Sequence, residues 1–308
     1  MAATTRPPAD GPDPDADGPD PDAAGSGPDT AAADNGSRGV AGTAARLHRR
    51  LVVDRSRLGH RVGYALRHPG RVLPHLRRAA RDAWLRHRHP DHVSYYSAVM
   101  ASDARRSPEA AVGSANRERW LALGKMQYDY LVGHGLRPHH RMLEIGCGNL
   151  RAGRLFIAHL DAGNYHGIDI SPDILLHAHR TVAEYDLREK LPHLSLTRDL
   201  RLEFLPSDHF DVVHAHSVFS HSPLEVIDEC LAHVGRVLKP EGFFDFTFDR
   251  TEGEEHQVLR EDFYYRTETL VALARRHGLH ARFMDDWERL PHKQSKIRIA
   301  RSPEPRLT

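Results

Sequence analysis

Residues 141–153 read RMLEIGCGNLRAG, an apolar strand followed by a Gly-x-Gly turn. Gly146 and Gly148 let the backbone of this turn approach a ligand closely, because neither carries a side chain. The helix predicted after the turn would present unpaired N–H groups and a partial positive charge. Glu144 stands two residues before the turn, where a dinucleotide pyrophosphate has no use for a carboxylate. A ligand with an amino group and a positive centre fits this position better.

Strands and helices alternate from residue 117 onward. Seven strands are predicted, at MLEIG, YHGIDI, HLSLT, HFDVVHAH, GFFDFTF, ARFM and SKIRIA. Helices are predicted over residues 117–135, 152–159, 171–185, 222–238 and 268–279. Such alternation indicates an α/β fold, a doubly wound and mostly parallel seven-stranded sheet with helices on both faces. Asp169 ends the second strand, 23 residues after Gly146, where a carboxylate can accept both hydroxyls of a ribose.

Five motifs in this order resemble those of class I S-adenosylmethionine-dependent methyltransferases, over about residues 117–300. They are LEIGCGNLRAG, YHGIDIS, LTRDL, FDVVHAHSVFSHSP and RVLKPEGFFDFTF. The resemblance implies a Rossmann-like fold, methyltransferase activity and S-adenosyl-L-methionine as cofactor, with no metal required. One departure is Leu150, which stands where the first motif usually has another glycine. We therefore expect the helix start to be arranged differently around the methionine part of the cofactor.

The resemblance also assigns roles to single residues. Glu144 and the turn hold the amino-acid end of the cofactor, the end of the second strand holds its ribose, and the loop after the third strand holds its adenine. The alternative for Glu144 and Asp169 is that each acid caps the helix that follows. The predicted cofactor-binding residues are Glu144, Gly146, Cys147, Gly148, Asn149, Asp169, Ile170, Asp199, Leu200 and His216.

Two histidines, His216 and His221, are candidates for the general base. His214 and His216 alternate on one strand and so point to the same side, and His216 lies at the carboxyl end, where ligands bind in open α/β sheets. His221 follows in the next loop. Either ring could take the proton of an acceptor hydroxyl near neutral pH; the alternative for His216 is packing against the cofactor. We interpret Cys147 as a small residue that fits the turn, not as a nucleophile.

The fourth motif restricts the acceptor. It reads His-Ala-His-Ser, where relatives that methylate base amino groups have Asn or Asp before Pro-Pro and an aromatic residue. No Pro-Cys of a cytosine-carbon enzyme stands there either. The motif resembles instead the branch that acts on small molecules or glycans, and we expect methylation at oxygen. The alternatives are an RNA methyltransferase and a non-catalytic cofactor-binding module that serves a partner.

Composition divides the chain into three predicted regions. Residues 1–45 form an acidic Pro/Ala/Asp-rich tail, predicted to be disordered because it has almost no large apolar side chain. Residues 46–115 form a basic helical extension, and residues 116–308 form the methyltransferase domain. Between residues 46 and 92 there are 13 arginines against three aspartates. This stretch could lie on an anionic membrane, bind nucleic acid, or pack on the main domain with a solvated basic face.

The remaining features concern the compartment. The start of the chain lacks the pattern of a secretory signal, and no run of about 18 apolar residues is present. The two cysteines form neither a metal-binding nor a redox spacing. A cytoplasmic location is therefore expected, with a peripheral position at the inner face of the membrane as the alternative that the basic extension raises.

Overall fold

A computed structural model describes residues 80–81, 83–89, 91–104, 114, 116–258, 262–303 and 307. All of them belong to one compact unit, residues 73–308. The predicted acidic tail and residues 46–79 of the predicted basic extension lie outside the described residues. Their expected contacts with a membrane surface or with nucleic acid stay predictions. No helix of the described part has the length and apolar character needed to cross a membrane.

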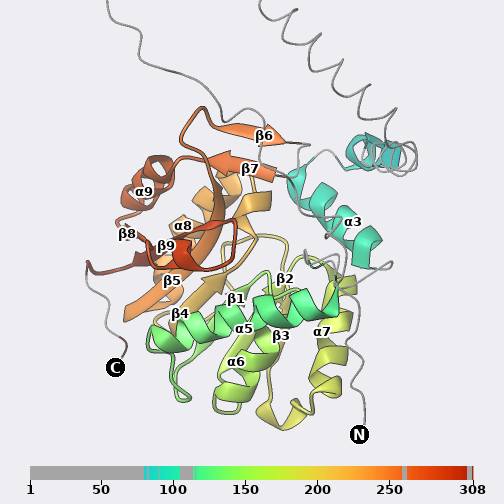
Figure 1. The fold of residues 1–308 in the computed structure, drawn as a ribbon, viewed down its shortest axis with the longest axis vertical. Coiled ribbons are helices and arrows are strands. Elements are labelled where there is room, and N and C mark those ends of the chain that lie inside the picture. Colours follow the sequence, from blue (N-terminus) through green and yellow to red (C-terminus); the bar gives the residue numbers. More distant parts are fainter. Residues whose placement is uncertain are drawn as a thin grey trace, which may run out of the picture. The chain divides into compact units, whose positions relative to one another are not determined.

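All seven predicted strands are present in one sheet (Figure 1). Five of them are parallel neighbours, β9 runs antiparallel to β5, and β8 runs antiparallel to β9. The turns after β1, β2 and β4 therefore meet at one edge of the sheet, as parallel pairing requires. In spatial order the strands are β3 (His193–Leu196), β2 (Tyr165–Asp169), β1 (Met142–Ile145), β4 (Phe210–Ala215), β5 (Leu238–Arg250), β9 (Ser295–Ala300) and β8 (His280–Phe283).

A short hairpin adds two strands that the sequence analysis did not predict. β6 (His256–Val258) and β7 (Asp262–Tyr265) pair antiparallel, and β7 pairs with the last two residues of β5. The three residues of β6 are all exposed, so they lack the alternation of buried and exposed side chains that reveals a strand. The hairpin matters because it brings Asp262 to the carboxyl end of the sheet.

Helices cover both faces of the sheet, as predicted (Figure 1). One apolar core joins α5 (Arg117–Gly133), α6 (Gly153–His159) and α7 (Pro172–Glu184) to alternate strand residues such as Met142 and Val212. A second core joins α8 (Leu224–Val237) and α9 (Thr267–Arg276) to the residues between them, such as Leu143 and Val213. Side chains of successive strand residues point to opposite faces, so one strand supplies both cores.

Helix α3 (His92–Ala104) precedes the predicted methyltransferase domain and packs on α7. Tyr95 and Val99 are buried one helical turn apart, together with Leu85. The Ser97 hydroxyl donates to the carbonyl of Ile170, 3.1 Å away, directly after the second strand. The end of the predicted extension therefore contacts the edge of the sheet where a ligand is expected.

Candidate functional site

The turn after β1 has the backbone conformation that its glycines predict. Gly146 and Gly148 have φ angles of +67° and +55°, values that glycine adopts without steric cost. A Cβ added at Gly146 would lie 2.4 Å from Cγ2 of Val218, so no side chain fits there. Leu150 also has a positive φ, +65°, and is fully buried. The chain thus keeps a left-handed backbone at the position where the sequence analysis expected glycine, and the burial of the Leu150 side chain offsets part of the strain.

Asp169 connects the ends of β1 and β2. Its Oδ2 accepts the N–H of Gly148 at 2.9 Å and its Oδ1 accepts the N–H of Ser171 at 3.0 Å. Burial raises the pKa of Asp169, while these two N–H groups act in the opposite direction. The cap of α7 is the hydroxyl of Ser171, which accepts the N–H of Ile174 at 3.3 Å. Asp169 does not cap the helix, and its carboxylate lies beside the glycine turn.

Glu144 lies beneath the same turn. Its side chain is buried and accepts a hydrogen bond from the hydroxyl of Tyr165. Burial raises the pKa of Glu144 to about 7, although the Tyr165 hydrogen bond and the charge of Arg151 oppose that rise. Its Oε2 would lie 2.9 Å from a Cβ at Gly153, so the carboxyl group reaches the first residue of α6. This acid can therefore hold or release a proton near neutral pH.

The other two turn residues have side chains that bind the protein itself. Cys147 is buried, and burial raises the pKa of its thiol well above the ordinary value, which disfavours a nucleophilic thiolate. Asn149 accepts the indole N–H of Trp120 at 2.9 Å through its Oδ1. Its carbonyl accepts the hydroxyl of Thr181, also at 2.9 Å. These contacts with α5 and α7 fix the turn.

The loop after β3 differs from the expected arrangement at one group. Asp199 is exposed and Leu200 is buried, and the N–H of Leu200 donates to Oε1 of Glu229 at 2.7 Å. The sequence analysis assigned Leu200 to the adenine of the cofactor, so a ligand that uses the N–H of Leu200 would have to displace Glu229. The sequence holds no local signal for this contact, because Glu229 lies on α8, 29 residues further along the chain.

His216 follows β4 and lies in a buried aromatic cluster. Neither ring nitrogen has a hydrogen-bond partner within the part of the chain that the structure describes. Its ring lies 4.5 Å from that of His292 and 5.8 Å from that of Trp287. Burial, followed by the neighbouring His292, lowers the pKa of His216 well below its ordinary value. At neutral pH the ring is therefore uncharged, with two unsatisfied nitrogens.

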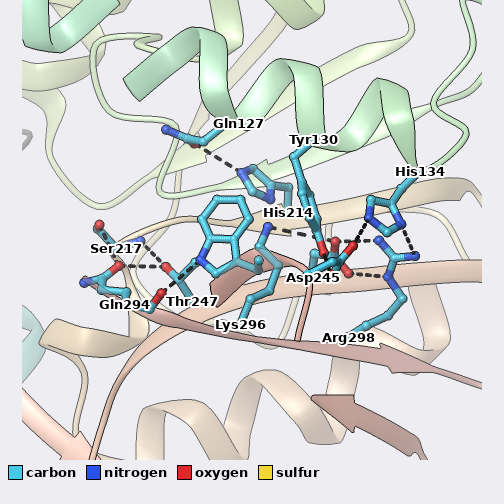
Figure 2. A network of polar contacts seen from close by, with 12 residues as sticks. Gln127, Tyr130, His134, His214, Ser217, Asp245, Thr247, Gln294, Lys296 and Arg298 are labelled. Atoms are coloured by element: carbon cyan, nitrogen blue, oxygen red, sulfur yellow. Dashed lines mark hydrogen bonds and ion pairs between the residues drawn. The ribbon is translucent and has the colours of Figure 1, made fainter. Parts of the chain in front are cut away.

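A row of ionisable side chains crosses the sheet next to this cluster, and Figure 2 shows three of them, His214, Asp245 and Arg298. The strand register aligns Glu144, His214, Asp245 and Arg298 on the face that α5 covers. Arg298 donates to both carboxylate oxygens of Asp245, at 2.6 and 2.8 Å. Burial, the largest single effect, would raise the pKa of Asp245, but the charge and hydrogen bonds of Arg298 together with the charge of Lys296 outweigh it and lower that pKa. The row is therefore anchored by a buried bidentate ion pair.

Lys296 lies on the same face as Arg298, opposite Thr247, and is therefore nearer to the edge where the parallel strands end (Figure 2). Its ammonium is buried, lies 3.9 Å from Oδ2 of Asp245, and lies 3.8 Å from the ring centre of Trp287. Burial lowers the pKa of Lys296 to about 8. The sequence analysis did not identify this row. In the sequence the row is visible as polar residues at alternate positions of two largely apolar strands, namely Asp245 in FDF and Lys296 and Arg298 in KIR.

His221, the second base candidate, lies in a different environment. It ends the short helix η2 (Phe219–His221), and its Nδ1 lies 3.0 Å from Oδ1 of Asp262 in the unpredicted hairpin. Its carbonyl accepts Nε2 of His92 at 2.8 Å, and its ring stacks on Tyr96, with 5.7 Å between ring centres. His216 therefore lies in the buried aromatic cluster, whereas His221 lies beside the carboxylate of Asp262. Among the described residues no group of three or more His, Cys, Asp or Glu is arranged to hold a metal ion.

Comparison with known proteins agrees with this geometry. The family model described as a methyltransferase domain matches residues 143–244, which contain the turn, Asp169 and β4. An uncharacterized protein of Haemophilus influenzae is 27% identical over 141 residues, and the match spans 45% of this chain and 55% of that protein. The magnesium protoporphyrin IX methyltransferase of Synechocystis PCC 6803, solved with bound S-adenosylmethionine, shares the fold. Its TM-score is 0.51 at 16% identity, over 69% of this chain and 98% of that one.

A second structure of the Synechocystis enzyme, with bound S-adenosylhomocysteine, gives a TM-score of 0.51 at 15% identity, over 69% of this chain and all of that one. These likenesses show the fold, and the family match covers the segment in which the glycine turn and the two acids meet. Residues 143–244 therefore match a methyltransferase domain, and the chain shares its fold with an S-adenosylmethionine-binding methyltransferase.

Proposed function

We propose that this chain transfers a methyl group from S-adenosylmethionine to an oxygen atom of a small-molecule or glycan acceptor. The observation that carries the proposal is the meeting of Asp169 with the Gly146–Gly148 turn at the carboxyl edge of the sheet. Two buried acids and a turn without side chains fit a ligand that has a ribose, an amino group and a positive sulfur. The unsatisfied nitrogens of His216 beside this turn also leave donors and acceptors for a ligand.

Different residues of the chain would bind different parts of this cofactor. Glu144 and the backbone of residues 146–149 would hold its amino-acid end, and Asp169 with Ile170 would hold its ribose. Asp199 and Leu200 would hold its adenine, with Glu229 released from the N–H of Leu200. When bound, the cofactor supplies a methyl carbon that its sulfonium makes electrophilic. The work left to the protein is to orient the acceptor, exclude water and take up one proton.

His221 is better suited than His216 to take up that proton. A proton on His216 would add a buried positive charge near Lys296 and Arg151, whose charges already oppose it. A proton on His221 would instead be stabilised by the carboxylate of Asp262, 3.0 Å away. We therefore assign His221 as the general base and His216 as a contact of the cofactor. The His-Ala-His-Ser motif, which lacks the Pro-Pro of amino-methylating relatives, supports oxygen as the methylated atom.

Calorimetric titration with S-adenosylhomocysteine tests the cofactor site. Asp169→Ala is expected to weaken binding at least tenfold, because the substitution removes hydrogen bonds to a charged group, each of which contributes about 1.5–3 kcal/mol. Asp161→Ala serves as the control, since this exposed aspartate lies in the loop before β2, at the opposite edge of the sheet. Equal affinity of wild type and Asp169→Ala would remove Asp169 from the site.

A comparison of cellular metabolites would identify the acceptor. Extracts of cells with and without the gene should differ in a small molecule or glycan that is heavier by one methylene when the enzyme is present. A methylated nucleoside in the RNA fraction would instead support a nucleic-acid substrate. Cofactor binding without any methylated product would support a non-catalytic partner module.

A further inference from the structure

Three segments that are distant in sequence surround His221. Its Nδ1 lies 3.0 Å from Oδ1 of Asp262 on β7. Asp249, at the end of β5, lies close enough that the charge of His221 lowers its pKa and that of Asp262 raises it, while burial, the largest effect, also raises it. The imidazole therefore contacts the carboxylate of Asp262 and lies within electrostatic range of the carboxyl group of Asp249.

Helix α3 contributes the third segment. His92 donates through Nε2 to the carbonyl of His221, at 2.8 Å. Tyr96 lies nearly parallel to the His221 ring, at 20° and 5.7 Å between centres, and His92 lies at 14° to Tyr96. His92 also contacts the edge of Phe263, the neighbour of Asp262, with 5.5 Å between ring centres. α3 thus contacts both the backbone and the ring plane of His221, and the strand that carries Asp262.

Stability alone is a weak reason for this arrangement. The His221 and Asp262 side chains are 30% and 37% exposed, and exposed ion pairs contribute little because solvent screens them. A carboxylate at Nδ1 has a second effect, because a neutral imidazole carries one proton and its position depends on the hydrogen bond that the other nitrogen makes. The contact therefore affects which nitrogen is the base.

We propose that Asp262 is a positioning residue that keeps a proton on Nδ1 of His221, so that Nε2 carries the lone pair that accepts the acceptor proton. This inference rests on the proposed function and deepens it. In the step, the acceptor O–H bond breaks and its proton goes to Nε2, while the freed electron pair forms the new bond to the methyl carbon. The bond from that carbon to sulfur breaks, and its electron pair stays on the sulfur. The positive charge passes from sulfur to the imidazole, where Asp262 and Asp249 stabilise it.

Long-range proton–nitrogen NMR of the full chain labelled with ¹⁵N-histidine tests the proposal without any acceptor. The His221 signal is identified as the one that His221→Gln removes. At pH 8, wild type is expected to hold the proton on Nδ1. Asp262→Ala is expected to shift the ratio of the two tautomers at least tenfold toward a proton on Nε2, since the negative charge 3.0 Å from Nδ1, which stabilises a proton there, is lost. Asp262→Glu, which restores a carboxylate, should recover the wild-type ratio.

The chain offers a matched control in a second histidine–aspartate pair. His277 Nε2 lies 2.6 Å from Oδ1 of Asp228, with side chains 22% and 36% exposed. Asp228→Ala should leave the His221 tautomer unchanged. An unchanged His221 tautomer in Asp262→Ala would overturn the inference.

Titration with S-adenosylhomocysteine separates this inference from the proposed function. Loss of the expected tautomer shift in a chain that binds S-adenosylhomocysteine removes only the role of Asp262. A wild-type chain that does not bind S-adenosylhomocysteine removes the proposed function, whatever the tautomer. With an identified acceptor, Asp262→Ala is expected to lower kcat more than tenfold and leave KM nearly constant.

Discussion

The carboxyl group of Glu144 lies beneath the glycine turn, and burial raises its pKa from 4.5 to about 7. Between these values the folded chain binds more protons than the unfolded chain at this site. Stability from this group is therefore fully present below pH 4.5 and is lost as the pH rises through 7. The loss amounts to roughly 3 kcal/mol, from about 1.4 kcal/mol for each pH unit of the shift.

Glu144→Gln resembles the protonated acid and should remove this dependence. Urea unfolding at pH 5 and pH 7.5 is expected to show that wild type loses roughly 2.4 kcal/mol of stability relative to Glu144→Gln, because part of the whole loss has already occurred at pH 5. Glu241→Gln replaces an exposed glutamate on β5 and should follow wild type at both pH values. Parallel pH profiles for wild type and Glu144→Gln would contradict the buried-acid interpretation.

At the scale of residues, the sequence predicts positions better than partners. Glu144, Gly146 and Asp169 could be placed together because parallel strands end at one edge and their turns follow directly. That the N–H of Leu200 donates to Glu229 could not be predicted, since it depends on how α8 packs. The contact of His221 with Asp262 was missed for the same reason, because 41 residues separate them.

At the scale of elements, α5 also approaches the segment after the glycine turn closely at Gly124, which has no side chain. A Cβ at Gly124 would lie 2.2 Å from the backbone oxygen of Arg151, whereas a Cβ at Gly133 of the same helix would meet nothing within 4 Å. Gly124→Ala is expected to destabilise the fold by about 1–3 kcal/mol, the usual cost of overpacking. It should also weaken S-adenosylhomocysteine binding, because the turn must move.

Gly133→Ala provides the comparison within one helix. It should be neutral or stabilise the fold by up to about 1 kcal/mol, since alanine loses less backbone freedom than glycine on folding. Thermal unfolding and calorimetric titration of both variants measure the two effects. Equal stability of the two variants would show that α5 does not pack against the turn this closely.

The elements themselves could be predicted where their pattern repeats. β1, β4 and β9 are buried at every residue, and α7 begins at Pro172 with Ser171 as its cap, as expected. β6 and β7 were missed because β6 exposes every residue and pairs only with β7. Short exposed strands depend on a partner strand and leave no periodic signal of their own.

At the scale of the whole molecule, the row of ionisable side chains that joins β1, β4, β5 and β9 is expected to affect global stability. Arg298→Met would leave Asp245 buried without its partner, which costs about 3–5 kcal/mol. Arg282→Met replaces the exposed arginine that is paired with Arg298 in the register of β8 and β9. This control should change stability by less than about 0.5 kcal/mol in urea unfolding.

The triple variant Asp245→Met/Lys296→Met/Arg298→Met keeps this prediction testable if Arg298→Met does not fold, because removing Asp245 and Arg298 alone would leave the buried ammonium of Lys296 without its carboxylate. Removing all three charges should recover most of the stability, because the cost arises from uncompensated buried charge and not from the loss of the ion pairs. A triple variant no more stable than Arg298→Met would show that Arg298 stabilises the fold in some other way, such as its packing over the Phe243 ring at 3.7 Å.

Helix α3 has two attachments, one through Ser97 to the residue after Asp169 and one through His92 to His221. These two contacts link the end of the second strand to the loop that carries His221. By thermodynamic reciprocity, a ligand that binds beside Asp169 and shifts this helix would change the affinity for a ligand beside His221 by the same factor as the second changes the first. We therefore expect the helix before the matched domain to couple the two proposed binding positions.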